Sequence, residues 1–350
     1  MALIRKYAAL DGAGQIVVCE EECPEPKPGQ LLVKVRASLV SPGTELGGVK
    51  QRRENPGEPG TPRMFGYQNA GEVIGLGEGC EEIARGRRVA CMGGGYAPHA
   101  SYGCCPRNLC TLIPEGVSYE QAAFNHLAAT SLQAVRRAQP ELGEYFVVLG
   151  LGLVGQMAAQ LLRLSGARVM GWDRIPLRLD IAAKTGTHRP VNVAEEDVKT
   201  VAKEFTRGWG VDGGIIAFGG EASEAFKALV GVMKVSPDGH EMGRITIVGG
   251  AQVTATWAAG LGNLDIRSSA RTGPGYHDED WEHGKDYPPV FMQWNTKRNL
   301  EECLRLIQEG RLDVCSLITD EVPLEEAPAA CDKLIEHPDQ AMGVILKPTH

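Results

Sequence analysis

The sequence predicts an α/β protein with two domains, a small antiparallel β-domain and a doubly wound parallel sheet covered by helices. Three observations support this prediction. Residues 1–125 contain short apolar segments separated by glycine and proline. From about residue 128, apolar strands alternate with amphipathic helices. The chain has 350 residues, which is more than most single domains contain.

In residues 1–125 the expected elements are short. Strands are expected at residues 16–18, 31–37, 71–76 and 88–92. Turn residues separate them, which is typical of a small antiparallel β-domain. A helix is expected to begin at Ser118, where Ser118 and Gln121 have the spacing of a capping box.

One motif in the centre of the chain, residues 145–173, predicts a dinucleotide-binding site. A short apolar run is followed by Gly150-Leu151-Gly152-Leu153-Val154-Gly155. An amphipathic helix comes next, and then a second strand that ends at Asp173. In such a motif the first glycine makes the tight turn and the second lets the backbone approach a pyrophosphate. The third lets helix and strand pack closely. The alternative is an ordinary strand–helix–strand unit that binds no nucleotide.

Asp173 bears on the choice of cofactor. It lies 18 residues beyond Gly155 (173 − 155), near the usual spacing for a carboxylate that binds ribose hydroxyls. A carboxylate there accepts a hydrogen bond from a 2′-hydroxyl and repels a 2′-phosphate, which favours NAD over NADP. The neighbouring Arg174 would weaken that preference. We therefore expect NAD, with NADP as the less favoured alternative.

The rest of the second half continues the alternation of strand and helix. Strands are expected at residues 213–218 and 244–248, each followed by a Gly-Gly pair, with a helix at residues 222–233 between them. After Ser268 comes an aromatic and charged stretch that is too polar for a core. A final amphipathic helix, residues 297–308, and a final strand, residues 341–346, complete the chain.

Composition limits the possible functions. The chain is 43% hydrophobic and 23% charged, as is ordinary for a soluble globular protein, and its net charge of −8 favours neither nucleic acid nor an anionic membrane as a partner. We see neither a signal-peptide core nor a run of about 20 apolar residues. Ten cysteines are scattered along the chain, which suggests reduced thiols. A cytoplasmic protein is therefore expected.

The order of these elements resembles the medium-chain dehydrogenase/reductase superfamily over essentially the whole chain. Further matching pieces are residues 66–71, Gly94-Gly95-Tyr96-Ala97, residues 113–118 and residues 121–123. The resemblance implies a GroES-like catalytic domain at residues 1–125 and a Rossmann domain at residues 126–296. It also implies a return segment at residues 297–350 that completes the catalytic domain, an active site between the domains and, by analogy, a homodimer.

The residues expected to bind the catalytic zinc of this superfamily are absent. Zinc-dependent members carry a cysteine where this chain has Ser41, and Gly-His-Glu where it has Gly66-Tyr67-Gln68. Neutral Ser, Tyr and Gln supply no thiolate, imidazole or carboxylate. The structural-zinc lobe of four closely spaced cysteines is not reproduced either, and the adjacent Cys104 and Cys105 would crowd a tetrahedral site. The chain thus resembles a zinc-independent branch, and we expect no metal.

Without a metal, a side chain must exchange a proton with the reacting oxygen. Tyr67, at the vacated ligand position, is the first candidate, and the alternative is a tyrosine packed in the core. Glu45 follows, with a salt bridge as the alternative. His126 and His99 are further candidates because histidine titrates near neutral pH, although histidines among apolar residues are usually core groups.

The remaining assignments rest on the resemblance and on position in the predicted sheet. Thr130 matches the superfamily position that touches the nicotinamide. Cofactor binding is assigned to the following residues: Gly150, Gly152, Leu153, Val154, Gly155, Asp173, Arg174, Arg178, Thr130, Phe218, Gly249 and Ser268.

Aromatic and charged residues near the end of the cofactor domain suit a polyhydroxylated ligand. Substrate binding is assigned to the following residues: Thr44, Tyr276, His277, Trp294 and Arg298. This run and residues 41–45 resemble a subgroup of oxidoreductases that stand alone or are fused to sugar-dehydrogenase-like domains. The alternative is an interdomain or dimer-interface loop.

The main hypothesis is a zinc-independent oxidoreductase that transfers a hydride between NAD(H) and a secondary alcohol or ketone of a sugar, glycoside or cyclitol. Three alternatives stay open. One is an NADPH-dependent quinone or enone reductase, which Asp173 disfavours. Another is an enzyme that oxidises a sugar transiently to enable elimination. The third is a nucleotide-binding sensor without catalysis.

Overall fold

The computed structural model describes residues 3–58, 60–290 and 292–350. The chain divides into two compact units. The first contains residues 1–129 and 272–350, and the second contains residues 130–271. The expected cofactor domain, residues 126–296, is therefore too long at its carboxyl end. Residues 272–296 belong to the first unit because they bond to it there: Asn108 Nδ2 donates to Trp281 O (2.7 Å) and Gly94 N donates to the Tyr276 hydroxyl (2.9 Å).

The first unit is built on a mostly antiparallel seven-stranded sheet, as expected from its short strands. The path is β18-β19-β3-β5-β6-β8, and β7 pairs with β3. These strands are β3 (Gln30–Leu39), β5 (Gln68–Leu76), β6 (Arg88–Met92), β7 (Tyr102–Pro106), β8 (Cys110–Leu112), β18 (Ile318–Pro323) and β19 (Gly343–Lys347). β19 from the end of the chain pairs with β3, so the return segment completes this sheet.

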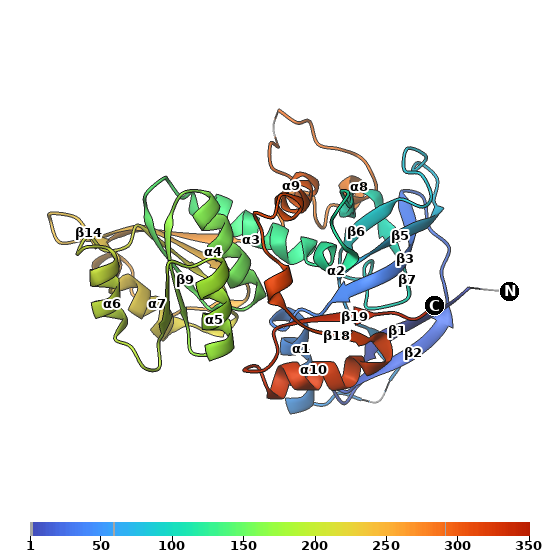
Figure 1. Ribbon diagram of the computed structural model, residues 1–350, viewed down its shortest axis with the longest axis horizontal. Coiled ribbons are helices and arrows are strands. Elements are labelled where there is room, and N and C mark those ends of the chain that lie inside the picture. Colours follow the sequence, from blue (N-terminus) through green and yellow to red (C-terminus); the bar gives the residue numbers. More distant parts are fainter. Residues whose placement is uncertain (1–2, 59, 291) are drawn as a thin grey trace. The chain divides into compact units, whose positions relative to one another are not determined.

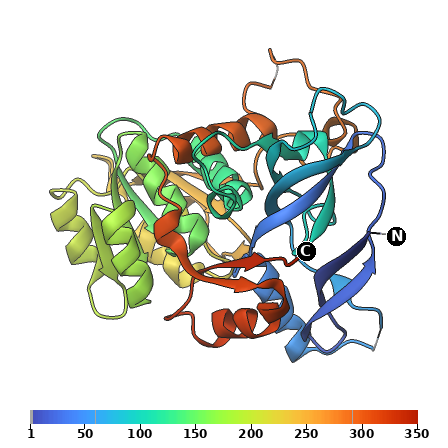
Figure 2. The ribbon, with the colours of Figure 1, turned by 45° about the vertical axis from the view of Figure 1, so that its right-hand side comes forward.

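A smaller sheet and several helices surround it. β1 (Ile4–Leu10) pairs with both β2 (Ile16–Glu22) and β4 (Arg63–Met64). The helices are α1 (Thr44–Glu54), α2 (Tyr119–Ala122), α8 (Glu279–Glu282), α9 (Thr296–Gln308) and α10 (Ala327–Glu336). Figures 1 and 2 show α10 beside β1 and β2, and it packs against β2. The predicted capping box of Ser118 and Gln121 is confirmed at the start of α2.

The second unit is a parallel sheet with helices, in the order β11-β10-β9-β12-β15-β14, and β17 also pairs with β15. Its strands are β9 (Tyr145–Leu149), β10 (Arg168–Asp173), β11 (Arg189–Asn192), β12 (Gly213–Ile216), β14 (Lys234–Val235), β15 (Glu241–Val248) and β17 (Asn263–Ser269). Only the β14–β15 pair of this sheet is antiparallel. In this order, β10 and β11 follow β9 toward one edge of the sheet, and β12 and β15 continue from β9 toward the other edge. Open α/β sheets bind ligands at the point where the strand order reverses in this way.

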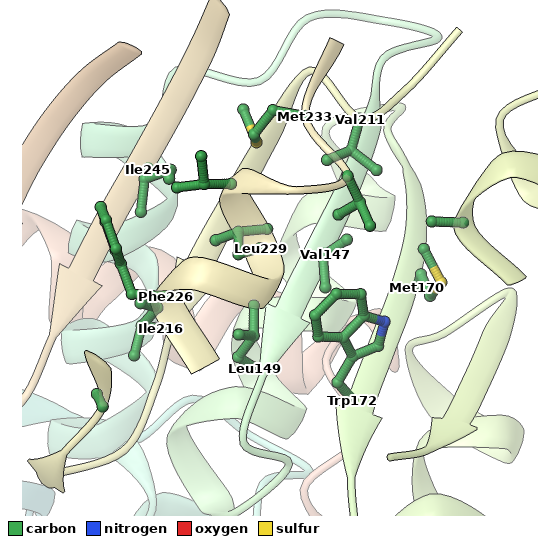
Figure 3. Close-up of a cluster of buried hydrophobic side chains, with 14 of the residues drawn as sticks. Val147, Leu149, Met170, Trp172, Val211, Ile216, Phe226, Leu229, Met233 and Ile245 are labelled. Carbon is green, nitrogen blue, oxygen red and sulfur yellow. The ribbon is translucent and has the colours of Figure 1, made fainter. Parts of the chain in front are cut away.

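Along the chain, four helices connect successive strands of this unit. They are α4 (Leu153–Leu164), α5 (Pro176–Thr185), α6 (Val198–Phe205) and α7 (Ser223–Val230). Helix α3 (Asn125–Ala138) precedes β9. Val147, Leu149, Trp172 and Ile216 from neighbouring strands belong to one buried cluster with Phe226 of α7 (Figure 3). This packing holds the carboxyl ends of β9 and β10 in place, where the glycine motif begins. No helix among the described residues is long and apolar enough to cross a membrane.

Candidate functional site

The glycine motif forms the turn between β9 and α4, and its three glycines differ in what surrounds them. Gly150 has a φ of +84°, which glycine adopts at little cost. A Cβ on Gly155 would overlap the carbonyl oxygen of Gly150, so only glycine allows this close approach of helix and turn. A Cβ on Gly152 would meet nothing within 4 Å. The space next to Gly152 is thus open to a ligand.

The start of α4 is suited to an anion. Gly152 is the N-cap residue, and no side chain caps the helix. The first N–H groups of a helix have no partner within it, and the helix dipole favours negative charge at this end. The open space at Gly152 and the uncapped helix start together fit the pyrophosphate of a dinucleotide.

Asp173 ends β10 and is bonded to the glycine turn. Its Oδ2 accepts from Leu151 N at 2.8 Å, while Oδ1 accepts from Arg174 N at 2.7 Å and Ile175 N at 3.0 Å. Arg178 Nη1 lies 3.6 Å from Oδ2. A carboxylate has about four acceptor positions, so one remains for a ribose hydroxyl. The adjacent Arg178 reduces the negative charge that an incoming 2′-phosphate would meet.

Other cofactor candidates lie around this turn. A Cβ on Gly150 would lie 3.0 Å from the ring of Phe218, and one on Gly249 would lie 3.7 Å from Phe218 O, so the ends of three strands converge there. Leu153 and Val154 begin α4, where Val154 O accepts from Ser131 Oγ at 3.0 Å. Ser268 lies on β17, and its carbonyl oxygen accepts from Arg137 Nε at 3.2 Å, while Thr130 lies in α3.

In the first unit, Glu45 and His99 form a buried polar chain that ends at Ser38. Glu45 lies in the first turn of α1, and its Oε2 accepts from Ser41 N at 2.7 Å. His99 Nε2 lies 3.3 Å from the same oxygen, and His99 Nδ1 contacts Ser38 Oγ on β3. The other oxygen, Glu45 Oε1, is buried without a hydrogen-bond partner among the described residues. A buried carboxylate oxygen without a partner is costly, and a polar ligand would remove that cost.

Tyr67 lies beside this chain. Its phenol hydrogen-bonds the side chains of Ser41 and Thr44. Burial, together with the charge of Glu45, raises the pKa of Tyr67 well above its usual range. Tyr67 therefore keeps its proton at all physiological pH values and is a hydrogen-bond donor rather than a base.

Three of the other predicted residues gather next to Tyr67. The His126 ring lies 4.7 Å from that of Tyr67 and 5.8 Å from that of Tyr276, and Tyr276 stacks on His277 at 3.9 Å. His126 Nδ1 is 3.3 Å from Tyr67 O. Burial lowers the pKa of His126 from 6.5 to about 4, so the imidazole is neutral at pH 7. His126 is thus a hydrogen-bonding group at neutral pH and a poor proton carrier.

Trp294 and Arg298 form a separate pair at the start of α9. The Arg298 guanidinium lies 3.8 Å from the centre of the Trp294 ring, and its Nη1 donates to Gln293 O at 2.7 Å. The pair is thus organised by its own stacking and by the α9 N-terminus, whereas the Tyr67 group is organised by α1, β3 and His126.

Three polar residues of this region were not among the predicted site residues. Ser38 ends the polar chain, Gln68 Nε2 donates to Leu39 O at 3.1 Å, and Asn125 is 3% exposed. Gln68 Oε1 and both polar atoms of the Asn125 amide are buried without partners among the described residues. The only sequence signal was a polar residue inside an apolar segment, and that signal is too common to identify a site.

The donor set does not fit a catalytic zinc ion at positions 41, 67 and 68. Ser41, Tyr67 and Gln68 offer neutral oxygen and nitrogen atoms that already bond one another or the backbone. Among the described residues, three or more Cys, His, Asp or Glu donors come within 4.8 Å of one another only at Cys91, Cys105 and Cys110. No step of the chemistry below is therefore assigned to a metal.

His126 makes the stability of the first unit pH-dependent. Between pH 6.5 and about 4 the unfolded chain binds a proton on His126 and the folded chain does not. The free energy of unfolding is therefore expected to fall as the pH drops through this window, by up to about 3 kcal/mol from this residue. Urea denaturation at several pH values should show that His126→Asn loses less stability on acidification than wild type does. Equal slopes for wild type and His126→Asn would contradict the assignment.

The sequence is similar to those of known dehydrogenases. A family model described as zinc-binding dehydrogenase matches residues 154–282. D-arabitol-phosphate dehydrogenase of Enterococcus avium is 24% identical, over 93% of this chain and 92% of that protein. D-guloside 3-dehydrogenase of Escherichia coli (strain K12) is 27% identical, over 80% of this chain and 77% of that protein.

Solved structures share the whole fold. An Escherichia coli oxidoreductase/dehydrogenase of unknown specificity superposes with a TM-score of 0.83 at 19% identity, covering 99% of this chain and 100% of that one. A zinc-binding dehydrogenase from Sinorhizobium meliloti bound to NADP has a TM-score of 0.76 at 21% identity, covering 99% and 100%. An Escherichia coli alcohol dehydrogenase complexed with NADH has a TM-score of 0.75 at 19% identity, covering 98% and 99%. The predicted combination of a GroES-like and a Rossmann domain is thereby confirmed.

The chain is therefore an oxidoreductase enzyme of the dehydrogenase type. More particularly, it is similar to a family model described as zinc-binding dehydrogenase and to two enzymes named for a sugar-alcohol phosphate and a glycoside.

Proposed function

We propose that this protein transfers a hydride between NAD(H) and a secondary alcohol or ketone of a sugar, glycoside or cyclitol, without a catalytic zinc ion. One observation carries the proposal: the buried Glu45–His99 pair, with an unpartnered carboxylate oxygen, next to a tyrosine that keeps its proton. Such an arrangement can bind and deprotonate an alcohol where zinc-dependent relatives use a metal.

The second unit is proposed to hold the dinucleotide. The uncapped start of α4 and the open space at Gly152 receive the pyrophosphate, and Asp173 accepts a hydrogen bond from a ribose hydroxyl. NAD, when bound, supplies the acceptor for the hydride. The carboxylate of Asp173 favours NAD, and the nearby Arg178 makes that preference smaller than an isolated carboxylate would.

Proton transfer is assigned to the first unit. Tyr67 donates a hydrogen bond to the substrate oxygen and holds it in place, and it cannot act as the base because its pKa is raised. Glu45 takes the proton through Oε1, its free oxygen. His99 and Ser38 then stabilise the protonated carboxyl group through the hydrogen bond at Oε2. In ketone reduction the same residues act in reverse order.

The relatives and the unpaired polar atoms support the proposed substrate class. D-arabitol-phosphate dehydrogenase and D-guloside 3-dehydrogenase are both named for polyhydroxylated substrates. The buried amide of Asn125 and Gln68 Oε1 have no hydrogen-bond partners among the described residues, and neighbouring hydroxyls of a sugar would satisfy them. The Tyr276–His277 stack offers an aromatic face for sugar C–H groups.

A substrate panel tests the proposal. Purified enzyme is expected to form NADH from NAD with at least one member of a panel of pentitols, hexitols, their phosphates, methyl glycosides and inositols. Turnover is expected to be faster with NAD than with NADP and to persist after treatment with a zinc chelator. Loss of activity on chelation in enzyme that stays folded by circular dichroism, with recovery when zinc is added back, would contradict the metal-free mechanism. Turnover of simple enones with NADPH alone would show a reductase, and tight NADH binding with no turnover would show a sensor.

A further inference from the structure

Three cysteines lie close together in the core of the first unit. Cys91 lies on β6, Cys105 on β7 and Cys110 on β8, and all three are at most 4% exposed. Cys91 is directly opposite Cys110 in the antiparallel β6–β8 pair, and their sulfur atoms are 3.6 Å apart. The three sulfur atoms lie within 4.8 Å of one another. Side chains from three strands thus bring three sulfur atoms, each a potential metal ligand, close together.

The crowding expected from the adjacent Cys104 and Cys105 does not occur. Successive residues of a strand point to opposite faces. Cys104 Sγ accordingly turns outward and donates to Pro24 O at 3.3 Å, while Cys105 Sγ points into the core and donates to Tyr96 O at 3.0 Å. The expectation that both thiols cannot belong to one tetrahedral site is not contradicted, because only Cys105 lies in the cluster.

A cavity lies next to this cluster. Its volume is about 430 Å³, and Cys110 lines it together with Thr111 and Lys297. The positive charge of Lys297 therefore lies on the wall of the same cavity as Cys110.

We propose that Cys91, Cys105 and Cys110 bind a thiophilic metal ion, with zinc as the expected occupant. Zinc–sulfur bonds of about 2.3 Å place tetrahedrally arranged sulfur atoms roughly 3.8 Å apart. The sulfur atoms of this cluster are 3.6 Å to at most 4.8 Å apart, so each sulfur–sulfur distance needs to change by about 1 Å or less. Thiolates select zinc and copper(I) over hard cations. Thiols that are still protonated release their protons to solvent as the metal binds, and Lys297 offsets the net negative charge of the complex.

This site differs from a four-cysteine lobe within one loop, because its ligands come from three strands. It is also separate from the proposed catalytic chemistry. Its role would be to join β6, β7 and β8, and so to stabilise the first unit in the way that structural zinc contributes folding free energy.

Metal binding by matched cysteine variants tests the proposal. Reduced, metal-free enzyme is incubated with one equivalent of Zn²⁺, desalted, and analysed for bound metal. Wild type and Cys104→Ala are expected to retain about one zinc ion per chain, and Cys105→Ala to retain less than a tenth of that. Zn²⁺ is also expected to raise the Tm of wild type and Cys104→Ala but not that of Cys105→Ala. Equal zinc retention by Cys104→Ala and Cys105→Ala, or none by wild type, would overturn the site.

X-ray absorption at the zinc edge of the wild-type protein covers the case in which Cys105→Ala fails to fold. Three sulfur neighbours are expected around the ion, and a shell of only oxygen and nitrogen would overturn the proposal. Glu45→Ala is expected to retain the zinc. Loss of turnover in Glu45→Ala with zinc still bound would support both proposals. Zinc binding by a wild-type protein that turns over no substrate would support the cysteine site and contradict the proposed function.

Discussion

Gly155→Ala is expected to prevent stable folding of the second unit, whereas Gly152→Ala is expected to fold and to lose dinucleotide binding. A methyl group on Gly155 would overlap the Gly150 carbonyl oxygen, which is backbone and cannot move aside. We expect destabilisation of about 3 kcal/mol or more. A methyl group on Gly152 meets nothing within 4 Å and sits on a backbone with φ −70°. It fills the space proposed for the pyrophosphate.

Two measurements separate the variants. Thermal unfolding followed by circular dichroism should give Gly152→Ala a Tm near that of wild type and Gly155→Ala a much lower one. NADH fluorescence titration should show at least tenfold weaker binding by Gly152→Ala. Gly47→Ala is a control in the first unit, because a Cβ there also meets nothing within 4 Å. Wild-type NADH affinity in Gly152→Ala would contradict the proposed pyrophosphate position.

Glu45→Gln is expected to lower kcat by about 10²- to 10⁴-fold, the usual contribution of a general base. The glutamine keeps the size of the side chain, and its amide oxygen can still accept from Ser41 N. It cannot take a proton from the substrate. KM is expected to change much less than kcat because Tyr67 still binds the substrate oxygen.

Steady-state kinetics and matched variants check this assignment. Glu54→Gln, at the exposed end of the same helix α1, is expected to leave kcat unchanged. Tyr67→Phe is expected to raise KM as well as to lower kcat, because it removes a hydrogen bond to the substrate in both states. If kcat of Glu45→Gln matches wild type while Tyr67→Phe is inactive, the base lies elsewhere and Tyr67 alone organises the site.

Short-range sequence patterns predicted several local features of the structure correctly. The glycine motif, the strand that ends at Asp173 and the Ser118–Gln121 capping box each lie within a few residues or one strand–helix–strand unit. Their physical basis is local: backbone conformation, side-chain periodicity and hydrogen bonds over one turn. The order of such elements was enough to predict both folds.

The long-range contacts were not predictable in the same way. His99 is 54 residues from Glu45 and 61 from Ser38, so their contact depends on how β3, α1 and the turn before β7 pack. Gly66 is part of that packing, because a Cβ there would crowd the His99 ring at 2.8 Å. In the sequence, Glu45 and His99 are separate candidates, and no local pattern connects them.

The cysteines show the same division. The sequence predicted that Cys104 and Cys105 would crowd a tetrahedral site. It gave no sign that Cys91 and Cys110, which are 19 residues apart in the chain, lie next to each other. Strand alternation turns one of the pair outward, and the β6–β8 register places Cys91 opposite Cys110.

The two-domain α/β fold, the glycine turn and the acid that follows it could be predicted from the sequence, because neighbouring residues make those features. Which polar groups share a hydrogen-bond network, and which thiols share a site, depends on the tertiary structure. Strand register and helix packing bring those groups together from separate parts of the chain, and no local pattern records where they meet.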